Sequence, residues 1–172
     1  MTYHNVRDKN TTLTILQSNI QLSIFHLAQV NVAQAKADME SELMRGFVSR
    51  LDEINALAES AEGFIWRLKE DSGSATAIRV FDDPLLLINM SVWANVESLK
   101  HYVYKSLHVE LIKDREAWFN KMGESYQALW WIPAGHIPST EEARNKLEYI
   151  RKHGPSAQAF NFTKLYQTPI PP

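Results

Sequence analysis

Hydrophobic and polar residues follow two different periods along this chain. In some stretches they alternate, so that successive side chains point to opposite faces, as they do in a strand. In others, apolar residues recur every three or four positions and build one apolar stripe on a helix. These patterns predict strands at 23–32, 63–69, 75–81, 85–93 and 126–132, and helices at 38–60, 95–122 and 140–152.

Turn and cap residues separate the predicted elements. The sequence DSGS at 71–74 predicts a hairpin between the strands on either side of it. Ser139 and Glu142 have the spacing of a capping box at the start of the third helix, and Gly154 follows its end. We therefore expect an extension at 1–22, one domain at 23–166 with a further candidate strand at 159–166, and a tail at 167–172.

The predicted order of elements is β-α-β-β-β-α-β, without an internal repeat, and it indicates the α+β class. If the middle strands form an antiparallel meander, the sheet is ferredoxin-like and carries both long helices on one face. The other face would expose Trp and Phe side chains, and a large uncovered apolar patch usually marks an interface. Pairing two sheets in a homodimer covers that face, so we expect a dimeric α/β barrel.

Composition narrows the classes of function. A chain of 172 residues with 45% hydrophobic and 22% charged residues fits one globular domain. The formal net charge is −2 and no basic block occurs, so nucleic acid is not an expected partner. Cysteine is absent, which excludes thiolate metal sites and cysteine nucleophiles. No apolar run is long enough to span a bilayer and the polar start lacks a signal-peptide core, so we expect a cytoplasmic chain without a membrane partner.

Two groups of segments resemble a known superfamily. LINMSVW at 87–93, VESL at 96–99 and KSLH at 105–108 resemble the strand and helix core of antibiotic-biosynthesis-monooxygenase-like dimeric α/β barrels. Other segments resemble one uncharacterised bacterial branch of that superfamily, still called a domain of unknown function: HLAQVN at 26–31, INAL at 54–57, GFIWRL at 63–68, REAWF at 115–119 and LWWIPAGH at 129–136. The resemblance covers residues 23–162.

The resemblance implies a homodimer with a small-molecule pocket, but it does not imply one reaction. The superfamily includes cofactor-free monooxygenases, haem-degrading oxygenases, isomerases and dehydratases, and a fold alone does not confer function. In the haem degraders an Asn, a Trp and a helical His work together. Asn31 matches the Asn, whereas Tyr102 and Ile112 stand near the other two positions. Haem degradation is therefore not expected.

The helix predicted at 95–122 carries a polar stripe beside its apolar one. His101, Tyr104, His108 and Arg115 are spaced so that they share one helical face with Leu111. A Tyr, a His and an Arg together suit an anionic or phenolic substrate, and His108 is a candidate general base near neutral pH. The alternative is that the stripe lies at the helix edge with its polar ends in solvent.

Polar and aromatic residues on the strands supply further candidates. Asn89 and Ser91 share one face of strand 85–93 with Trp93, where they either line a pocket and orient a carbonyl or join a structural network across the dimer. Asn55 either points into the pocket or makes a buried structural hydrogen bond. The other ligand-binding candidates, each with core packing or a structural hydrogen bond as its alternative, are His26, Asn31, Trp66, Trp118, Trp131 and His136.

These residues predict a small-molecule enzyme that resembles cofactor-independent monooxygenases and needs no cofactor. A flat aromatic or polyketide-like substrate loses a proton to His108, while Asn89 and Arg115 hold the developing oxyanion beside Tyr104. The same residues fit an isomerase, cyclase or dehydratase, because those reactions also begin with proton abstraction. A non-catalytic binder of a planar ligand such as haem, with His108 or His26 as axial ligand, is the third alternative. No H-x-x-x-H or H-E-x-x-H spacing occurs, so no metal site is expected.

Overall fold

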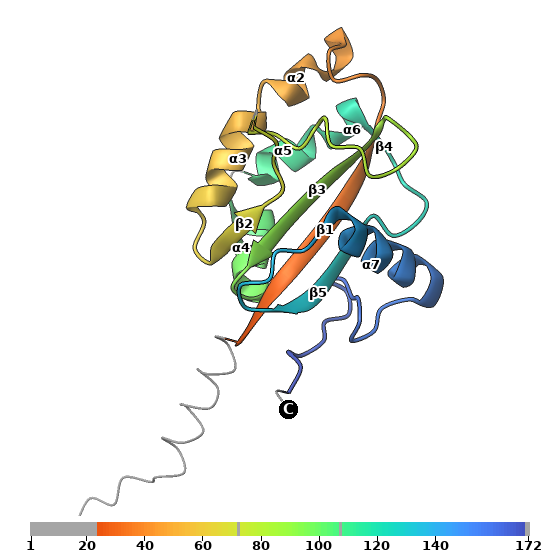
Figure 1. The fold of residues 1–172 in the computed structure, drawn as a ribbon. Coiled ribbons are helices and arrows are strands. Elements are labelled where there is room, and N and C mark those ends of the chain that lie inside the picture. The colour runs from red at the N-terminus through yellow and green to blue at the C-terminus, as the bar shows by residue number, and fades with distance from the viewer. Residues whose placement is uncertain (1–23, 72, 107, 171–172) are drawn as a thin grey trace, which may run out of the picture.

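The computed structural model of the chain describes residues 24–71, 73–106 and 108–170 (Figure 1). The extension predicted at 1–22 lies outside the described residues. None of the described helices is both long enough and apolar enough to cross a membrane.

One antiparallel sheet forms the centre of the described fold (Figure 1). The long strand β1 Phe25–Ala35 pairs along one edge with β3 Leu86–Trp93, and β2 Phe64–Arg67 pairs with the outer edge of β3. The other edge of β1 pairs with β5 Gln127–Pro133 and, further along, with β4 Phe119–Asn120. The order β2-β3-β1-β5 is that of a ferredoxin-like sheet, so the predicted fold class is confirmed.

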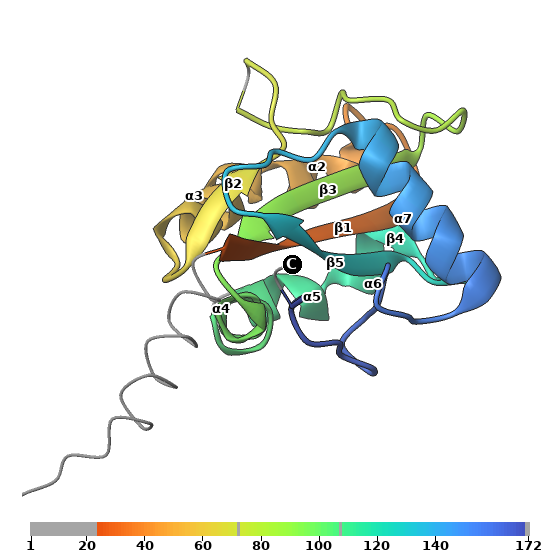
Figure 2. The ribbon, with the colours of Figure 1, turned by 60° about the horizontal axis from the view of Figure 1, so that its bottom comes forward.

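Alternation along β1 divides the core into two faces. Ala28, Val30 and Val32 pack toward α7 Thr140–His153, and we call this side of the sheet the α7 face. Leu27 packs on the opposite side, which we call the α4 face. That side is covered by α4 Val96–Lys105 and α3 Leu51–Ser60, so the two long helical regions share one face, as predicted. Figure 2 shows α7 on one side of the sheet and α4 on the other.

The helix predicted at 38–60 is divided into three parts, which are η1 Glu42–Met44, α2 Arg45–Val48 and α3. Ser49 interrupts it, because its hydroxyl donates to the carbonyl of Gly46 at 3.1 Å and so competes with the helical pattern. The break allows Met44 to reach the far end of β1, where it is fully buried beside Ala35.

The helix predicted at 95–122 is likewise three short helices, α4, α5 His108–Lys113 and α6 Arg115–Trp118. Ser106 is extended, its hydroxyl donates to the Tyr102 carbonyl at 2.5 Å, and it accepts the N–H of His108 at 3.1 Å. A serine that takes over backbone hydrogen bonds in this way ends a helix. The prediction of one continuous polar stripe is therefore wrong, because Tyr104 lies on α4, His108 on α5 and Arg115 on α6.

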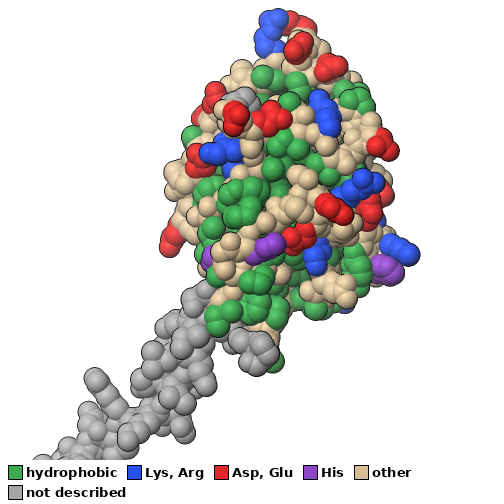
Figure 3. All heavy atoms as spheres, in the orientation of Figure 1, with side chains coloured by type: hydrophobic (Ala, Val, Ile, Leu, Met, Phe, Trp, Pro, Cys, Tyr) green, Lys and Arg blue, Asp and Glu red, His purple; other side chains and the backbone are tan. Residues whose placement is uncertain are grey.

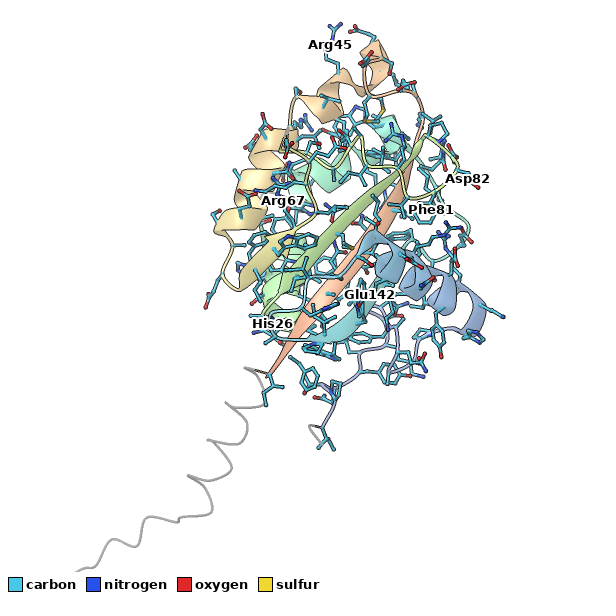
Figure 4. The ribbon with its side chains drawn as sticks, in the orientation of Figure 1. His26, Arg45, Arg67, Phe81, Asp82 and Glu142 are labelled. Carbon is cyan, nitrogen blue, oxygen red and sulfur yellow. The ribbon has the colours of Figure 1, made fainter. Side chains whose placement is uncertain are left out.

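The strand predicted at 75–81, and its hairpin, are wrong. β2 pairs directly with β3, with a bulge after Phe64, and no strand forms in the described segment 75–81. Its apolar residues Ile78, Val80 and Phe81 (Phe81 is labelled in Figure 4) pack instead onto the α7 face, and Arg144 of α7 lies over the Phe81 ring. An irregular segment lying on a sheet also turns alternate side chains inward, so the pattern alone did not distinguish it from a strand.

The third predicted helix is confirmed as α7. The Ser139 hydroxyl accepts the N–H of Glu142 at 3.0 Å, and Gly154 ends the helix with a φ of +76°. Ala143 and Leu147 are fully buried against the α7 face. A single chain therefore already covers part of the face that the sequence pattern left for a partner.

The candidate strand at 159–166 forms isolated bridges instead of a strand. Phe160 exchanges two backbone hydrogen bonds with Leu129 of β5, each 2.8 Å long. The Phe160 ring is fully buried in the cluster beneath α4, which anchors the C-terminal stretch to the α4 face.

Candidate functional site

A cavity of about 80 Å³ lies beside β3, past the point where β2 ends. A water molecule takes about 30 Å³ of liquid volume, so the cavity holds roughly three waters or the oxygen-bearing head of a small molecule. Strands β1 and β3, helix α3 and the segment after β2 form its wall, which consists of Asn31, Ala33, Leu51, Asn55, Arg67, Leu68, Ser74, Ala75, Thr76, Leu87, Ile88 and Asn89.

Three asparagines from three different elements meet in this wall. Asn31 on β1 and Asn89 on β3 are direct register partners, so their side chains stand next to each other on the α4 face. Asn55 approaches them from α3. For Asn55 the structure favours the pocket over a structural hydrogen bond, since no described residue is hydrogen-bonded to its side chain. The pocket thus brings together three residues that the sequence analysis selected separately, Asn89 and Asn55 from their positions and Asn31 from the resemblance.

A buried glutamine orients one of these amides. Gln29, only 5% exposed, donates from Nε2 to Oδ1 of Asn89 at 2.8 Å. Because the oxygen of Asn89 is engaged, its Nδ2 group is the end available to a ligand. The side chain of Asn31 has no hydrogen-bond partner among the described residues. The wall therefore presents amide hydrogen-bonding groups whose capacity the described chain leaves largely unused.

Arg67 also lines the pocket, and the sequence pattern did not select it. Its side chain, labelled in Figure 4, is 9% exposed. Nε donates to Glu59 at 2.9 Å, and Nη2 donates to the Gly73 carbonyl at 2.8 Å. Simple alternation placed Arg67 on the same side as Ile65, but the bulge after Phe64 shifts the register. The signal that could have found it is an arginine inside an otherwise apolar strand.

Glu59 carries the charge that faces Arg67. The hydrogen bond from Arg67, and then its positive charge, hold the pKa of Glu59 below its usual range. The same carboxylate lies 3.5 Å from the ammonium group of Lys69. Glu59 therefore stays ionised at neutral pH and holds the guanidinium in place through the bond to Nε.

An aromatic stack stands next to the pocket under α4. The Trp93 indole is fully buried, donates to the Ser91 hydroxyl at 2.8 Å, and stacks on Tyr102 with ring centroids 5.1 Å apart. His108 contacts the Tyr102 ring at 4.9 Å. Burial raises the pKa of Tyr102 to about 12, against a smaller opposing effect of the Arg67 charge. Ser91 and Trp93 thus serve the core here, and Tyr102 remains protonated at neutral pH.

The other residues of the predicted catalytic set lie outside the pocket wall. His108 is half-buried against Tyr102, with Nδ1 3.4 Å from the Val103 carbonyl. Tyr104 is 56% exposed and contacts the ring of Phe162, and Arg115 lies over the ring of Tyr126. Of the predicted set, Asn89 alone reaches the cavity.

The remaining candidates divide between the two faces. His26 and Trp66 pack on the α7 face, where His26 Nδ1 is buried without a partner among the described residues. His136 is exposed and pairs with Glu142 of α7 at 2.8 Å. Trp118 is buried under α2, and Trp131 donates to the Tyr166 carbonyl at 2.9 Å. None of these side chains lines the cavity.

Metal ligands do not gather in the part of the chain that the structure describes. No group of three or more His, Asp or Glu side chains there is arranged to hold a metal ion.

The pH dependence of stability tests the burial of His108. Burial lowers the pKa of His108, with a smaller opposing effect of the Val103 carbonyl, so the unfolded chain binds a proton there more readily than the folded chain. The stability is therefore complete above the ordinary histidine pKa and falls as the pH drops from that value toward the lowered folded pKa. His108→Phe keeps a ring on Tyr102 and binds no proton.

We expect the free energy of unfolding, measured with urea, to fall less in the His108→Phe variant than in the wild type between about pH 7.5 and about pH 5. His101→Gln, at an exposed position on α4, should keep the pH dependence of the wild type. Parallel curves for His108→Phe and the wild type would show that the imidazole is not buried.

Comparison with known proteins gives one family match. The model of the family described as "Domain of unknown function (DUF3291)" matches residues 26–171. No curated protein is similar to the chain. A mutant of SnoaB, a cofactor-independent oxygenase from Streptomyces nogalater, is 12% identical with a TM-score of 0.42, covering 65% of this chain and 95% of its own. A protein of unknown function from Nitrosomonas europaea is 13% identical with a TM-score of 0.43, covering 68% of this chain and 98% of its own.

Proposed function

The chain belongs to the DUF3291 family, which confirms the predicted membership of an uncharacterised family. On that premise we propose that it is a small-molecule enzyme that stabilises an oxyanion in the asparagine-lined pocket. The observation that carries the proposal is the meeting of Asn31, Asn55 and Asn89 around one cavity. Amide N–H groups that donate to a developing negative oxygen lower the energy of an enolate or phenolate. The substrate is therefore a flat carbonyl or phenolic compound, of aromatic or polyketide type.

Proton abstraction sets a geometric condition on that substrate. Among the described residues of the wall, none is a His, Tyr, Lys, Asp or Glu. The proposed base remains His108, which burial keeps neutral and which lies against Tyr102. The Tyr102 hydroxyl in turn is 3.4 Å from the Ile54 carbonyl, next to Asn55. The proposal therefore places the oxygen-bearing head of the substrate among the amides and requires its reacting carbon to reach His108.

Two reactions begin from the resulting carbanion. In the monooxygenase-like reaction, a substrate methylene and one O2 yield a carbonyl and one water, so no reductant or cofactor is needed. In the isomerase-type reaction, the proton returns to a different atom and oxygen is not consumed. We propose the first as the leading reaction, and the second as its alternative in the same pocket.

The pocket as folded does not fit haem. About 80 Å³ is far below the roughly 300–1,000 Å³ of typical pockets for whole ligands, and no histidine belongs to the described wall. His108 and His26, the two axial ligands considered from the sequence, lie on α5 and on the α7 face. Haem is therefore not a ligand of this pocket in the proposed function.

A substrate screen tests the proposed function. Purified protein is mixed with anthrones, hydroquinones and 1,3-dicarbonyl compounds while an oxygen electrode and product analysis record turnover. We expect protein-dependent O2 uptake, or product formation without O2 uptake for the isomerase alternative. Thermal stabilisation by a compound that is never converted would instead make the protein a binding module. If no compound of the panel stabilises the protein and none is converted, the result contradicts both the enzyme and the binding module.

We also propose that two chains pair through the α7 face. Trp66, Leu68, Ile78, Val80 and Leu86 are only partly buried there, and Figure 3 shows hydrophobic side chains gathered on this side of the molecule. An apolar patch of this kind is the usual mark of an interface. Sedimentation equilibrium is expected to give twice the chain mass of 19.8 kDa. A single-chain mass at micromolar concentration would contradict the pairing.

A further inference from the structure

A single charged side chain, Arg67, belongs to the described wall of the pocket. It is 9% exposed, and a buried guanidinium is stable only where hydrogen-bond acceptors and an opposite charge face it. Figure 4 shows that it lies beside α3, far from the other arginine that the figure labels, Arg45. The other described wall residues are neutral, so the charge of Arg67 favours a negatively charged ligand in the pocket.

The hydrogen bonds of Arg67 leave part of its fork free. A guanidinium has five N–H donors. Nε donates to Glu59 and Nη2 donates to the Gly73 carbonyl, while Nη1 has no hydrogen-bond partner among the described residues. Since Arg67 lines the cavity, these remaining donors are available to a ligand there.

The charges around Arg67 do not cancel. Glu59 is the carboxylate that faces it, and Glu59 is shared with Lys69 at 3.5 Å. One carboxylate therefore stands against two cations, and its side chain is 40% exposed, so solvent screens it more than it screens the buried Arg67. The pocket keeps a net positive character.

The asparagines add neutral donors to this charge. The oxygen of Asn89 is engaged by Gln29, so Asn89 offers its NH2 group to the cavity. Asn31 and Asn55 have no side-chain hydrogen bond to a described residue and can turn their NH2 groups inward. A ligand that only accepts hydrogen bonds and carries a negative charge matches this set of groups.

We propose that the pocket selects a substrate that carries a carboxylate next to a ketone. Arg67 binds the carboxylate, and the asparagines bind the ketone oxygen. The inference rests on the proposed function, because it names the substrate class of that same pocket. A cavity of about 80 Å³ accepts the oxo-carboxylate head of such a flat substrate, and this head carries both the carboxylate and the ketone oxygen that the two groups of donors need. Arg67 is then the residue that determines specificity, and Glu59 is a positioning residue.

Pyruvate and its uncharged analogue pyruvamide are the probes. Each is titrated into 15N-labelled full-length protein at constant ionic strength, and NMR follows the side-chain NH2 signals of Asn31, Asn55 and Asn89 with the Nε–H signal of Arg67. We expect saturable shifts with pyruvate and about ten- to hundredfold weaker binding of pyruvamide, the difference typical of a charge-assisted hydrogen bond.

Variants of Arg67 and Glu59 separate recognition from folding. Arg67→Gln should bind pyruvate about ten- to hundredfold more weakly, and Arg67→Lys should lie between it and the wild type. Glu59→Gln keeps an oxygen that accepts from Nε of Arg67 and so keeps the guanidinium positioned, but it removes the opposing charge, so the variant should bind pyruvate more tightly and pyruvamide unchanged. Arg45→Gln, which removes an exposed arginine also paired with a glutamate, is the matched control and should bind as the wild type does. If Arg67→Gln does not fold, Glu59→Gln still tests whether the charge of Arg67 binds the carboxylate.

The outcomes distinguish this inference from the proposed function. Equal binding of pyruvate and pyruvamide, or unchanged binding in Arg67→Gln or Glu59→Gln, overturns the role of Arg67. If neither probe shifts the asparagine signals but an uncharged phenol or dicarbonyl compound does, the carboxylate inference fails and the proposed function stands. If no compound shifts those signals, both fail.

Discussion

Replacing Trp93 with alanine is expected to lower the free energy of unfolding by about 3–5 kcal/mol, the usual loss for truncating a fully buried large aromatic residue. The indole is 0% exposed and is the centre of an aromatic cluster, with Tyr102 stacked on one side and Phe64 in edge contact at 5.4 Å. Its removal would also leave the Ser91 hydroxyl, itself buried, without its donor. Urea unfolding monitored by circular dichroism measures the change.

Two further variants make that result interpretable. Trp93→Phe keeps a ring between Phe64 and Tyr102 and should lose less stability than Trp93→Ala. Trp66→Ala removes a tryptophan that is only half-buried on the α7 face, so its effect should also be smaller. A loss below about 1 kcal/mol for Trp93→Ala would show that this indole is not part of the core, and would return it to the ligand-binding candidates.

Replacing Asn89 with alanine is expected to lower kcat about 10²- to 10³-fold, the effect of deleting one oxyanion donor. The side chain is exposed on the α4 face, so water can replace it as the acceptor for Gln29 and the fold should change in stability by about 1 kcal/mol or less. KM should change much less than kcat, because the contact strengthens as the negative oxygen develops. The measurement is steady-state kinetics with the compound that the screen identifies.

Asn89→Asp provides a sharper variant at the same position. It keeps the size of the side chain but places a negative charge next to the developing oxyanion, so activity should fall at least as far as in Asn89→Ala. Asn120→Ala, at an exposed asparagine of β4 outside the pocket wall, is the control and should behave as the wild type does. Equal activity of Asn89→Ala and Asn120→Ala would remove Asn89 from the mechanism.

Part of the candidate site could be selected from the sequence because strand alternation is local. Asn89 falls on the same side of its strand as Leu87, and alternation within that strand is enough to predict this. Asn31 was selected differently, because it matches an Asn of the superfamily's haem degraders, and alternation then places it on one side of the first strand. What brings the two amides together is the antiparallel register of β1 and β3, which pairs Asn31 with Asn89.

Arg67 and His108 show where local reasoning ends. The period of two fails at Arg67 because the bulge after Phe64 inserts one residue, and the sequence carries no separate mark of that bulge. The helical period of 3.6 residues does not place His108 correctly, because α4 ends at Ser106 and His108 begins a separate helix. A face predicted for a continuous helix therefore does not exist in the folded chain.

The sequence by itself determined which stretches have a buried side, the α+β class, the places of the strands at 25–35, 64–67, 86–93 and 127–133, and the limits of α7, whose Ser139 cap and Gly154 end act within a few residues of the chain. Only the tertiary structure decided that the segment 75–81 covers the α7 face instead of pairing as a strand, that Arg67 meets Glu59 at the pocket, and that three asparagines share one cavity. The physical reason is that hydrophobic periodicity specifies that a side chain is buried, whereas its partner is chosen by packing and hydrogen bonding between segments distant in the sequence.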